Sequence, residues 1–100
     1  MLLHLLLVWL QKPPVVLDVT DVTVRVYFDY EYASGGMGGM TVGLNESTLV
    51  TNRNGYCTFE NVPYGEHTII LYDVFTEVRE YPVTVDTEHN YFEFNGGLSL

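Results

Sequence analysis

The feature that most constrains the fold is a stretch in the middle of the chain, residues 51–72, in which turn residues separate two short apolar runs. Asn54-Gly55 can form a left-handed turn at low steric cost. Pro63 and Gly65 mark a second turn, because proline fixes φ and glycine accepts a positive φ. The runs on either side of this second turn are rich in aromatic and β-branched residues, which favour strands. The stretch therefore predicts turn, strand, tight turn, strand, with the two strands forming a hairpin.

A second run, 22–32, alternates strictly between core-type and mostly polar positions. Alternate residues of a strand point to opposite faces of a sheet, so this run predicts a strand with one face on a core and the other in water. The even positions supply the core face: Val22, Val24, Val26, Phe28, Tyr30 and Tyr32.

The rest of the chain predicts further short strands separated by turn signals. We expect residues 33–39, rich in glycine, to be a hairpin loop, and Pro82 to lie at a strand start or a sheet edge because it has no N–H to donate. Residues 86–90 are a polar turn. About seven short strands with turns every 8–12 residues predict an all-β antiparallel β-sandwich domain over residues 15–100.

The first ten residues are almost continuously apolar, and Pro13-Pro14 follows as a stiff, extended spacer, so residues 1–14 form a separate arm. Ten helical residues span about 15 Å, half of a bilayer's hydrocarbon core. Three interpretations stay open: a segment packed on its own domain, the end of a membrane anchor, or an arm that docks on a neighbouring subunit. The candidate contact residues of the arm are Leu3, Leu5, Leu7 and Trp9.

Composition narrows the possible partners. The 100 residues suit one domain, and 13 acidic against 4 basic side chains give a net charge of −9. Such a surface repels nucleic acid, so we expect no nucleic-acid partner. Cys57 is the only cysteine, which rules out a disulfide within the chain, and we expect it to be a small buried hydrophobe.

No motif predicts catalysis, a cofactor or a metal. The three histidines lack the spacing of a zinc site. Cys57 and His67 fall on consecutive predicted strands, yet we interpret them as neighbours rather than as a nucleophile and its base. The carboxylate pairs Asp18/Asp21 and Asp86/Glu88 are the best calcium candidates, but without dense acidic spacing they are better explained as solvated turn residues.

Tyrosines and one asparagine are the remaining candidate interaction residues. Several tyrosines are expected to face outward, where aromatic rings serve protein interfaces or stack on sugars; simple filling of half-buried strand positions is the plainer explanation. Tyr27 and Tyr64 are the two we single out. Asn45 begins an Asn-Glu-Ser acceptor pattern and could be glycosylated if the protein is exported. The tyrosines considered are Tyr27, Tyr56, Tyr64, Tyr72 and Tyr81.

Residues 50–68, V-T-N-R-N-G-Y-C-T-F-E-N-V-P-Y-G-E-H-T, resemble the T-D-x-x-G-x-x-x-F-x-N-V-P-x-G-x-Y-T stretch of carboxypeptidase-regulatory-like domains. These are transthyretin-like (prealbumin-like) β-sandwiches, similar in form to repeat domains of bacterial surface adhesins. Residues 39–44 stand where that family has its second strand, and the likeness spans about residues 22–94. Asn52 replaces the usual aspartate and His67 the usual aromatic residue.

The resemblance implies a stalk, accessory or adhesive module, often exported, and no catalysis. A catalytic branch of the fold that acts on a urate product has a Tyr-Arg-Gly-Ser ending, whereas this chain ends Gly-Gly-Leu-Ser-Leu without an arginine after Arg79. We therefore expect a non-catalytic structural or interaction module at the cell surface or outside the cell, self-associating or part of a larger assembly. The alternative is a carbohydrate-binding or accessory domain of a larger secreted enzyme.

Overall fold

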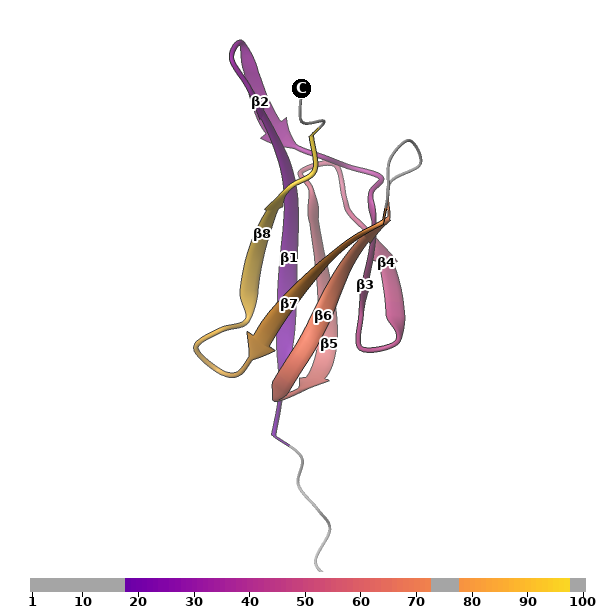
Figure 1. Ribbon diagram of the computed structural model, residues 1–100, viewed down its shortest axis with the longest axis vertical. Helices are drawn as coiled ribbons and strands as arrows, with labels where there is room; N and C mark the ends of the chain where they lie inside the picture. Colours follow the sequence, from indigo (N-terminus) through magenta and orange to yellow (C-terminus); the bar gives the residue numbers. More distant parts are fainter. Residues whose placement is uncertain (1–17, 73–77, 98–100) are drawn as a thin grey trace, which may run out of the picture.

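The computed structural model describes residues 18–72 and 78–97, which form two β-sheets packed face to face (Figure 1). The predicted all-β sandwich is confirmed, and the described residues contain no helix. Eight strands are present in this part of the chain: β1 (Val19–Tyr30), β2 (Ala33–Gly36), β3 (Thr41–Leu44), β4 (Ser47–Val50), β5 (Tyr56–Pro63), β6 (Gly65–Tyr72), β7 (Arg79–Val85) and β8 (Tyr91–Asn95).

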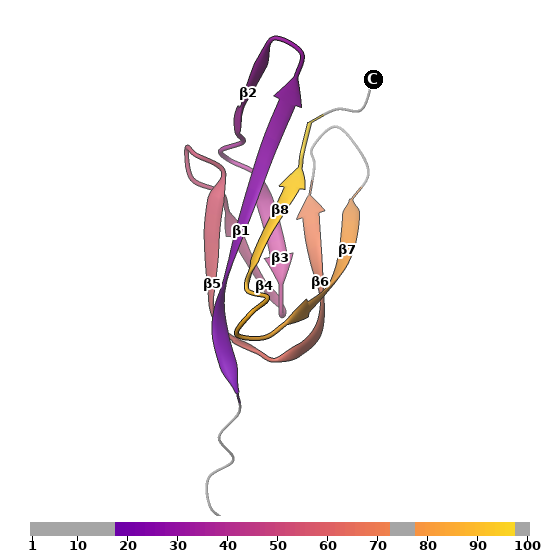
Figure 2. The same cartoon turned by 90° about the vertical axis from the view of Figure 1, so that its left-hand side faces the viewer.

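The first sheet is organised around β1, the longest strand. β2 and β5 pair with β1 along one edge, and β8 pairs with β1 along the other, while the second sheet has the order β4-β3-β6-β7. All ladders are antiparallel except that of β1 with β8, which is parallel. Figure 2 shows β1 and β8 running side by side in the same direction. The parallel pair is possible because β8 enters the first sheet after the chain has crossed from β7.

The core lies between the inner faces of the two sheets. On β1 the predicted alternation places the valines at positions 22, 24 and 26 inside, and the opposing sheet contributes Ile69 and Leu71. Partly buried methionines from the β2–β3 connection and aromatic rings from β7 and β8 pack against this core. Its fully buried members are Val22, Val24, Val26, Val42, Val62, Ile69, Leu71 and Val85.

The predicted core face of β1 does not continue to its end. Tyr30 is 45% exposed and Tyr32 is 91% exposed, so neither joins the core. The reason is geometric: β1 is longer than the strands that face it, and the β1–β2 hairpin projects beyond the body of the sandwich (Figures 1 and 2). Alternation predicts which way a side chain points, but not whether a second sheet lies there.

Residues 33–39 are not simply a loop, contrary to the prediction. Their first four residues are β2, which pairs with β1, and only the residues after Gly36 cross to the second sheet. β2 and β5 end against each other on the same edge of β1. A Cβ atom at Gly36 would lie 1.8 Å from the Asn54 carbonyl oxygen, and one at Gly55 would lie 2.2 Å from the Val26 carbonyl oxygen. The two glycines are therefore required by the close approach of backbones.

The tight turn after β5 is confirmed, but the hairpin is not. Gly65 adopts the expected positive φ of 127°, yet β5 belongs to the first sheet and β6 to the second. Tyr64 is the single residue between them, and its backbone N–H donates to the Asp18 carbonyl oxygen (3.0 Å). The chain turns here from one layer to the other instead of pairing with itself.

A β-bulge just before this corner keeps two apolar residues on the inner face. Phe59 and Val62 are both buried although they are three positions apart, which an ideal strand does not allow. The register with β1 shifts between Thr20 and Val22, Asn61 takes a positive φ of 55°, and its N–H donates to Asp21 Oδ1 (3.1 Å). The bulge thus turns Val62 into the core.

Candidate functional site

The outer face of the first sheet carries a cluster of aromatic and charged side chains, which we call the tyrosine patch: Arg25, Tyr27, Tyr56, Tyr91 and Glu93. Arg25 on β1 is the central residue, because it pairs in register with Tyr56 of β5 on one side and with Glu93 of β8 on the other. Three strands that are far apart in the sequence therefore meet in one row. The inner face of the same strands belongs to the core, so the patch has a rigid support.

Arg25 is held by rings and by a carboxylate. Its guanidinium carbon lies 5.5 Å from the ring centre of Tyr56 and 5.9 Å from that of Tyr27, within the range of cation–π contacts. Arg25 Nη1 is 3.8 Å from Glu93 Oε1. The Arg25 side chain keeps 27% of its surface exposed. Arg25 is therefore fixed in position while part of it faces solvent.

Tyr91 is tied to the same carboxylate. Its hydroxyl donates a hydrogen bond of 2.6 Å to Glu93 Oε1. This bond, followed by desolvation and the neighbouring Tyr56, raises the pKa of Tyr91 above its usual value. The phenol therefore stays neutral across the physiological range. Tyr91 remains 46% exposed and Tyr56 38% exposed, so both keep accessible ring surface.

The structure separates the tyrosines that the sequence grouped together. Tyr27 and Tyr56 belong to the patch, whereas Tyr64 is half-buried at the corner between the sheets. Tyr81 faces the core and stacks on Phe94, with 4.4 Å between the ring centres. Tyr72 lies on the outside of the other sheet, over Gly43, where a Cβ atom would be 3.2 Å from its ring.

Sequence reasoning missed three members of the patch: Arg25, Tyr91 and Glu93. A usable signal was present, since Arg25 lies at an odd, outward position of the alternating run and the order Tyr-Phe-Glu-Phe alternates in the same way on β8. What the sequence did not contain was the register that places these outward residues beside one another.

Asn45 lies on the surface at the first position of the two-residue turn between β3 and β4. Asn45 and Glu46 both have positive φ values, 50° and 63°, as a type I′ hairpin turn requires. The acceptor asparagine is exposed, and its glycosylation stays a prediction.

The candidate contact residues of the arm, Leu3, Leu5, Leu7 and Trp9, lie outside the described residues, as does the whole of 1–14. Within residues 18–72 and 78–97 no helix has the length and apolar character needed to cross a membrane.

Cys57 and His67 do not form a catalytic pair. They belong to different sheets, where Cys57 pairs with Val24 and His67 with Val83. Burial raises the pKa of the Cys57 thiol to about 11, which disfavours the thiolate that a nucleophile needs. The Nε2–H group of His67 donates to the Pro63 carbonyl oxygen (2.7 Å), so this ring fastens the corner between the sheets.

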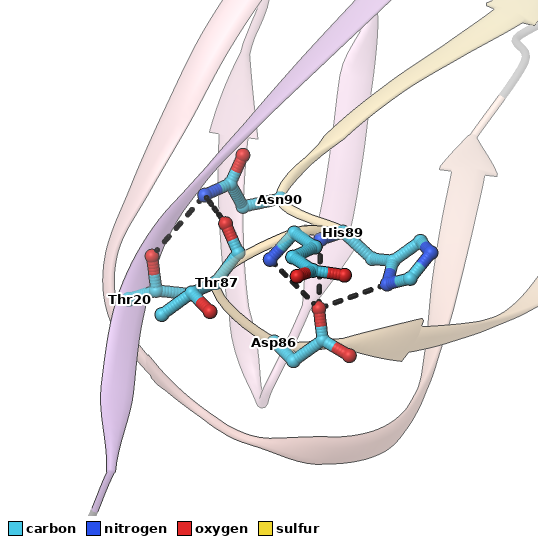
Figure 3. Close-up of polar contacts among 6 residues, drawn as sticks. Thr20, Asp86, Thr87, His89 and Asn90 are labelled. Carbon is cyan, nitrogen blue, oxygen red and sulfur yellow. Dashed lines mark hydrogen bonds and ion pairs between the residues drawn. The ribbon is translucent and has the colours of Figure 1, made fainter.

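One carboxylate of each pair considered for calcium, Asp21 or Asp86, accepts hydrogen bonds from backbone N–H groups. Asp86 Oδ1 accepts hydrogen bonds from the N–H groups of Glu88 and His89 (2.9 and 2.8 Å) and from His89 Nδ1 (2.8 Å), as Figure 3 shows. In the same turn, Asn90 Nδ2 bridges the Thr87 carbonyl oxygen and Thr20 Oγ1, which ties the β7–β8 connection to β1 (Figure 3). Among the described residues, no three His, Cys, Asp or Glu side chains are grouped to hold a metal ion.

Comparison with protein-family models finds no match to this chain, and comparison with curated protein sequences finds none either. The likeness to carboxypeptidase-regulatory-like domains stays a prediction, and the β-sandwich is what the described residues show.

Proposed function

We propose that the chain is a non-catalytic structural and interaction module of an extracellular or cell-surface assembly, and that the tyrosine patch is one of its protein-binding surfaces. The observation that carries the proposal is the gathering of three tyrosines and one arginine on the outward face of a sheet. Tyrosine and arginine are the residue types that dominate the energetic centres of protein interfaces. The resemblance to exported accessory modules supports the same role.

The fixed geometry of the patch favours binding. A side chain that becomes ordered on association costs about 0.5–1.5 kcal/mol, and pre-ordered side chains avoid part of this cost. Arg25 is already held between Tyr27, Tyr56 and Glu93, and the Tyr91 hydroxyl is already bonded. The exposed ring surfaces of Tyr56 and Tyr91 can then be buried against a partner at small entropic cost.

A second copy of the chain is the first partner to test. Sedimentation velocity at increasing concentration compares the wild type with the double variant Tyr56→Ser/Tyr91→Ser. Tyr32→Ser is the matched control, because Tyr32 is 91% exposed at the hairpin tip and outside the patch. We expect the double variant to associate at least 10-fold more weakly, which corresponds to about 1.4 kcal/mol, and the control to behave as the wild type. Equal association of all three proteins would contradict self-assembly through the patch.

Carbohydrate binding is a second candidate, favoured by one feature of the same site. The exposed rings of Tyr56 and Tyr91 lie beside the charged groups of Arg25 and Glu93, which combines stacking surfaces with hydrogen-bonding groups for hydroxyls. On a glycan array, a sugar bound by the wild type and by Tyr32→Ser but not by the double variant would support this function. An array without any bound sugar would remove it.

A further inference from the structure

The open side of the sandwich between β4 and β5 contains a groove of about 350 Å³. Its floor comes from both sheets, with Leu44 from one and Phe59 and Val62 from the other, and Leu49, which is 37% exposed, adds a fourth apolar side chain. The rest of the lining is polar: Asn45, Ser47, Thr58 and Glu60. An apolar cavity of about 150 Å³ accommodates a benzene ring, so this groove has room for about two apolar side chains.

Two unpaired strand edges border the groove. Within the described part of the chain, β4 pairs only with β3, and β5 pairs only with β1. At the other edge of the second sheet, Pro82 on β7 removes an N–H group and discourages strand addition. The β4 edge has no such protection and instead exposes Leu49 and Val50, the latter to 61%. An unpaired edge beside a groove with an apolar floor is what an added strand recognises.

We propose that residues 1–10 of a second copy of this chain add as a strand to the β4 edge, with Leu5 and Leu7 entering the groove and with Leu3 and Trp9 on the same face of the added strand beyond its two ends. This inference rests on the proposed role as an assembly subunit and names one of its contacts. Alternate residues of a strand share a face, so these four side chains form one apolar stripe. Backbone hydrogen bonds to a free edge provide affinity, and the stripe provides specificity.

Charge favours this occupant over a lipid surface. None of the 13 acidic side chains lies in residues 1–17, which carry a single basic residue, Lys12. The rest of the chain holds all of the acidic residues and only three basic ones, so it repels an anionic membrane. The arm is the part of the molecule that an acidic second copy does not repel.

The position of the arm favours exchange between two copies. Val62 in the groove pairs with Thr20, the second residue of β1, so the groove lies at the end of the sandwich where the chain enters β1. Figure 1 shows the β3–β4 turn at that same end. The ten peptide units that join Trp9 to Val19 span at most about 36 Å, enough to reach a neighbour.

Residues 11–18, between the arm and the domain, disfavour a turn that would bring the arm back onto its own domain. Pro13-Pro14 favours extended chain, and no glycine or asparagine lies in residues 11–18. Since the exit of the arm and the groove lie at one end, two copies can exchange arms about a two-fold axis and close as a dimer.

Disulfide trapping tests the contact directly. Full-length Leu5→Cys and Ser47→Cys chains, both in the Tyr56→Ser/Tyr91→Ser background, are mixed and oxidised, and covalent dimers are separated on a non-reducing gel. Because the patch is disabled, a failure here is distinct from a failure of the proposed function. Glu80→Cys, exposed on β7 at the opposite edge, replaces Ser47→Cys in the control. Cys57 can remain, because burial raises its pKa to about 11 and keeps it unreactive.

We expect the Leu5–Ser47 combination to give at least 10-fold more covalent dimer than the Leu5–Glu80 combination. Equal yields would overturn the proposal. A chain that carries both Leu5→Cys and Ser47→Cys distinguishes arm exchange between two copies from docking of the arm on its own domain. A disulfide formed only within one chain, without covalent dimer, would also overturn the proposal.

The alternation of the arm provides the second test, and it changes no residue of the sandwich. Sedimentation equilibrium compares Leu5→Asp/Leu7→Asp with Leu6→Asp/Val8→Asp, which introduces the same two charges on the other face of an extended strand. We expect at least a 10-fold loss of dimer for the first pair and a smaller loss for the second. Equal losses of dimer would show that the arm is helical and overturn the proposal. The proposal would also be overturned if the wild type bound phosphatidylcholine vesicles and both pairs of substitutions abolished that binding equally, because the arm would then be a lipid anchor.

Discussion

At the residue scale, the hydroxyl group of Thr51 fixes the connection between β2 and β3, one of those that join the two sheets. Thr51 is 4% exposed, and its Oγ1 donates to the Met37 carbonyl oxygen (2.6 Å) and accepts from the Met40 N–H (2.9 Å). The Thr51 backbone adds bonds to Gly39 and Met40. One buried side chain thus satisfies the polar groups of a segment that could not otherwise lie against the core.

Thr51→Val is expected to lower the free energy of unfolding by about 1–3 kcal/mol, because it leaves the partly buried Met40 N–H and Met37 carbonyl without the partner hydroxyl. Urea denaturation measures the change. Thr48→Val on the exposed strand β4 is the matched control and is expected to change the stability by less than about 0.5 kcal/mol. An equal effect of the two substitutions would show that the hydroxyl bonds of Thr51 contribute nothing specific.

Asp86 makes the β7–β8 turn sensitive to acid. The hydrogen bond from the His89 side chain, followed by those from the N–H groups of Glu88 and His89, holds the pKa of the Asp86 carboxyl group below its ordinary value of 3.8. Unfolded chains therefore bind this proton more readily than the folded protein. The stability that Asp86 contributes is present above pH 3.8 and is lost as the pH falls through the lowered pKa.

In thermal unfolding, the difference in Tm between the wild type and Asp86→Asn should therefore be largest near neutral pH and shrink below pH 3.8. Carbon NMR of the Asp86 carboxyl group gives an independent check. In His89→Ala the pKa of the Asp86 carboxyl group should move back toward 3.8, because the hydrogen bond that lowers it most has been removed. A titration unchanged by His89→Ala would refute this account of the turn.

At the element scale, the ends of β2 and β5 meet on one edge of β1 because two glycines let their backbones approach. Gly36→Ala would place a methyl group 1.8 Å from the Asn54 carbonyl oxygen, a backbone atom that cannot swing aside. We expect β2 to separate from β1 and its amides to lose protection in hydrogen exchange. The ladder between β1 and β5 should keep its protection.

Gly39→Ala is the control for this substitution, because it lies in the next loop with nothing within 4 Å of the added Cβ atom. Gly39→Ala should lower the free energy of unfolding by about 1 kcal/mol, because residue 39 has a left-handed backbone, and should leave the β2 amides protected from hydrogen exchange. Equal loss of β2 protection in both variants would mean that the loop conformation, and not the close approach at Gly36, holds the hairpin.

At the scale of the whole molecule, the net charge of −9 opposes association of two copies. The proposed contacts bury tyrosine rings and leucines and contain few charges. Salt should therefore strengthen association, because it screens the repulsion between the two acidic copies. We expect the association constant to rise between 0.01 M and 1 M NaCl, as the Debye length falls from about 30 to about 3 Å. Sedimentation equilibrium at several salt concentrations measures this trend. Weaker association in high salt would instead indicate an interface held by ion pairs.

Local patterns in the sequence were sufficient for the class of fold and for much of its detail. Side-chain parity follows from strand geometry alone, so the inward valines of β1 and the corner at Pro63 and Gly65 could be predicted. Pro82 lies on the edge strand β7, as its missing N–H requires. These features depend on each residue and its near neighbours.

Strand pairing was decided only in the tertiary structure, because it joins residues far apart in the chain. The parallel pairing of β1 with β8 and the separation of β5 from β6 into two sheets have no local signature. The same pairing brings Arg25, Tyr56 and Glu93 together. Alternation along each strand determines that these side chains face outward. Only the register across three strands makes them neighbours and thus a candidate binding surface.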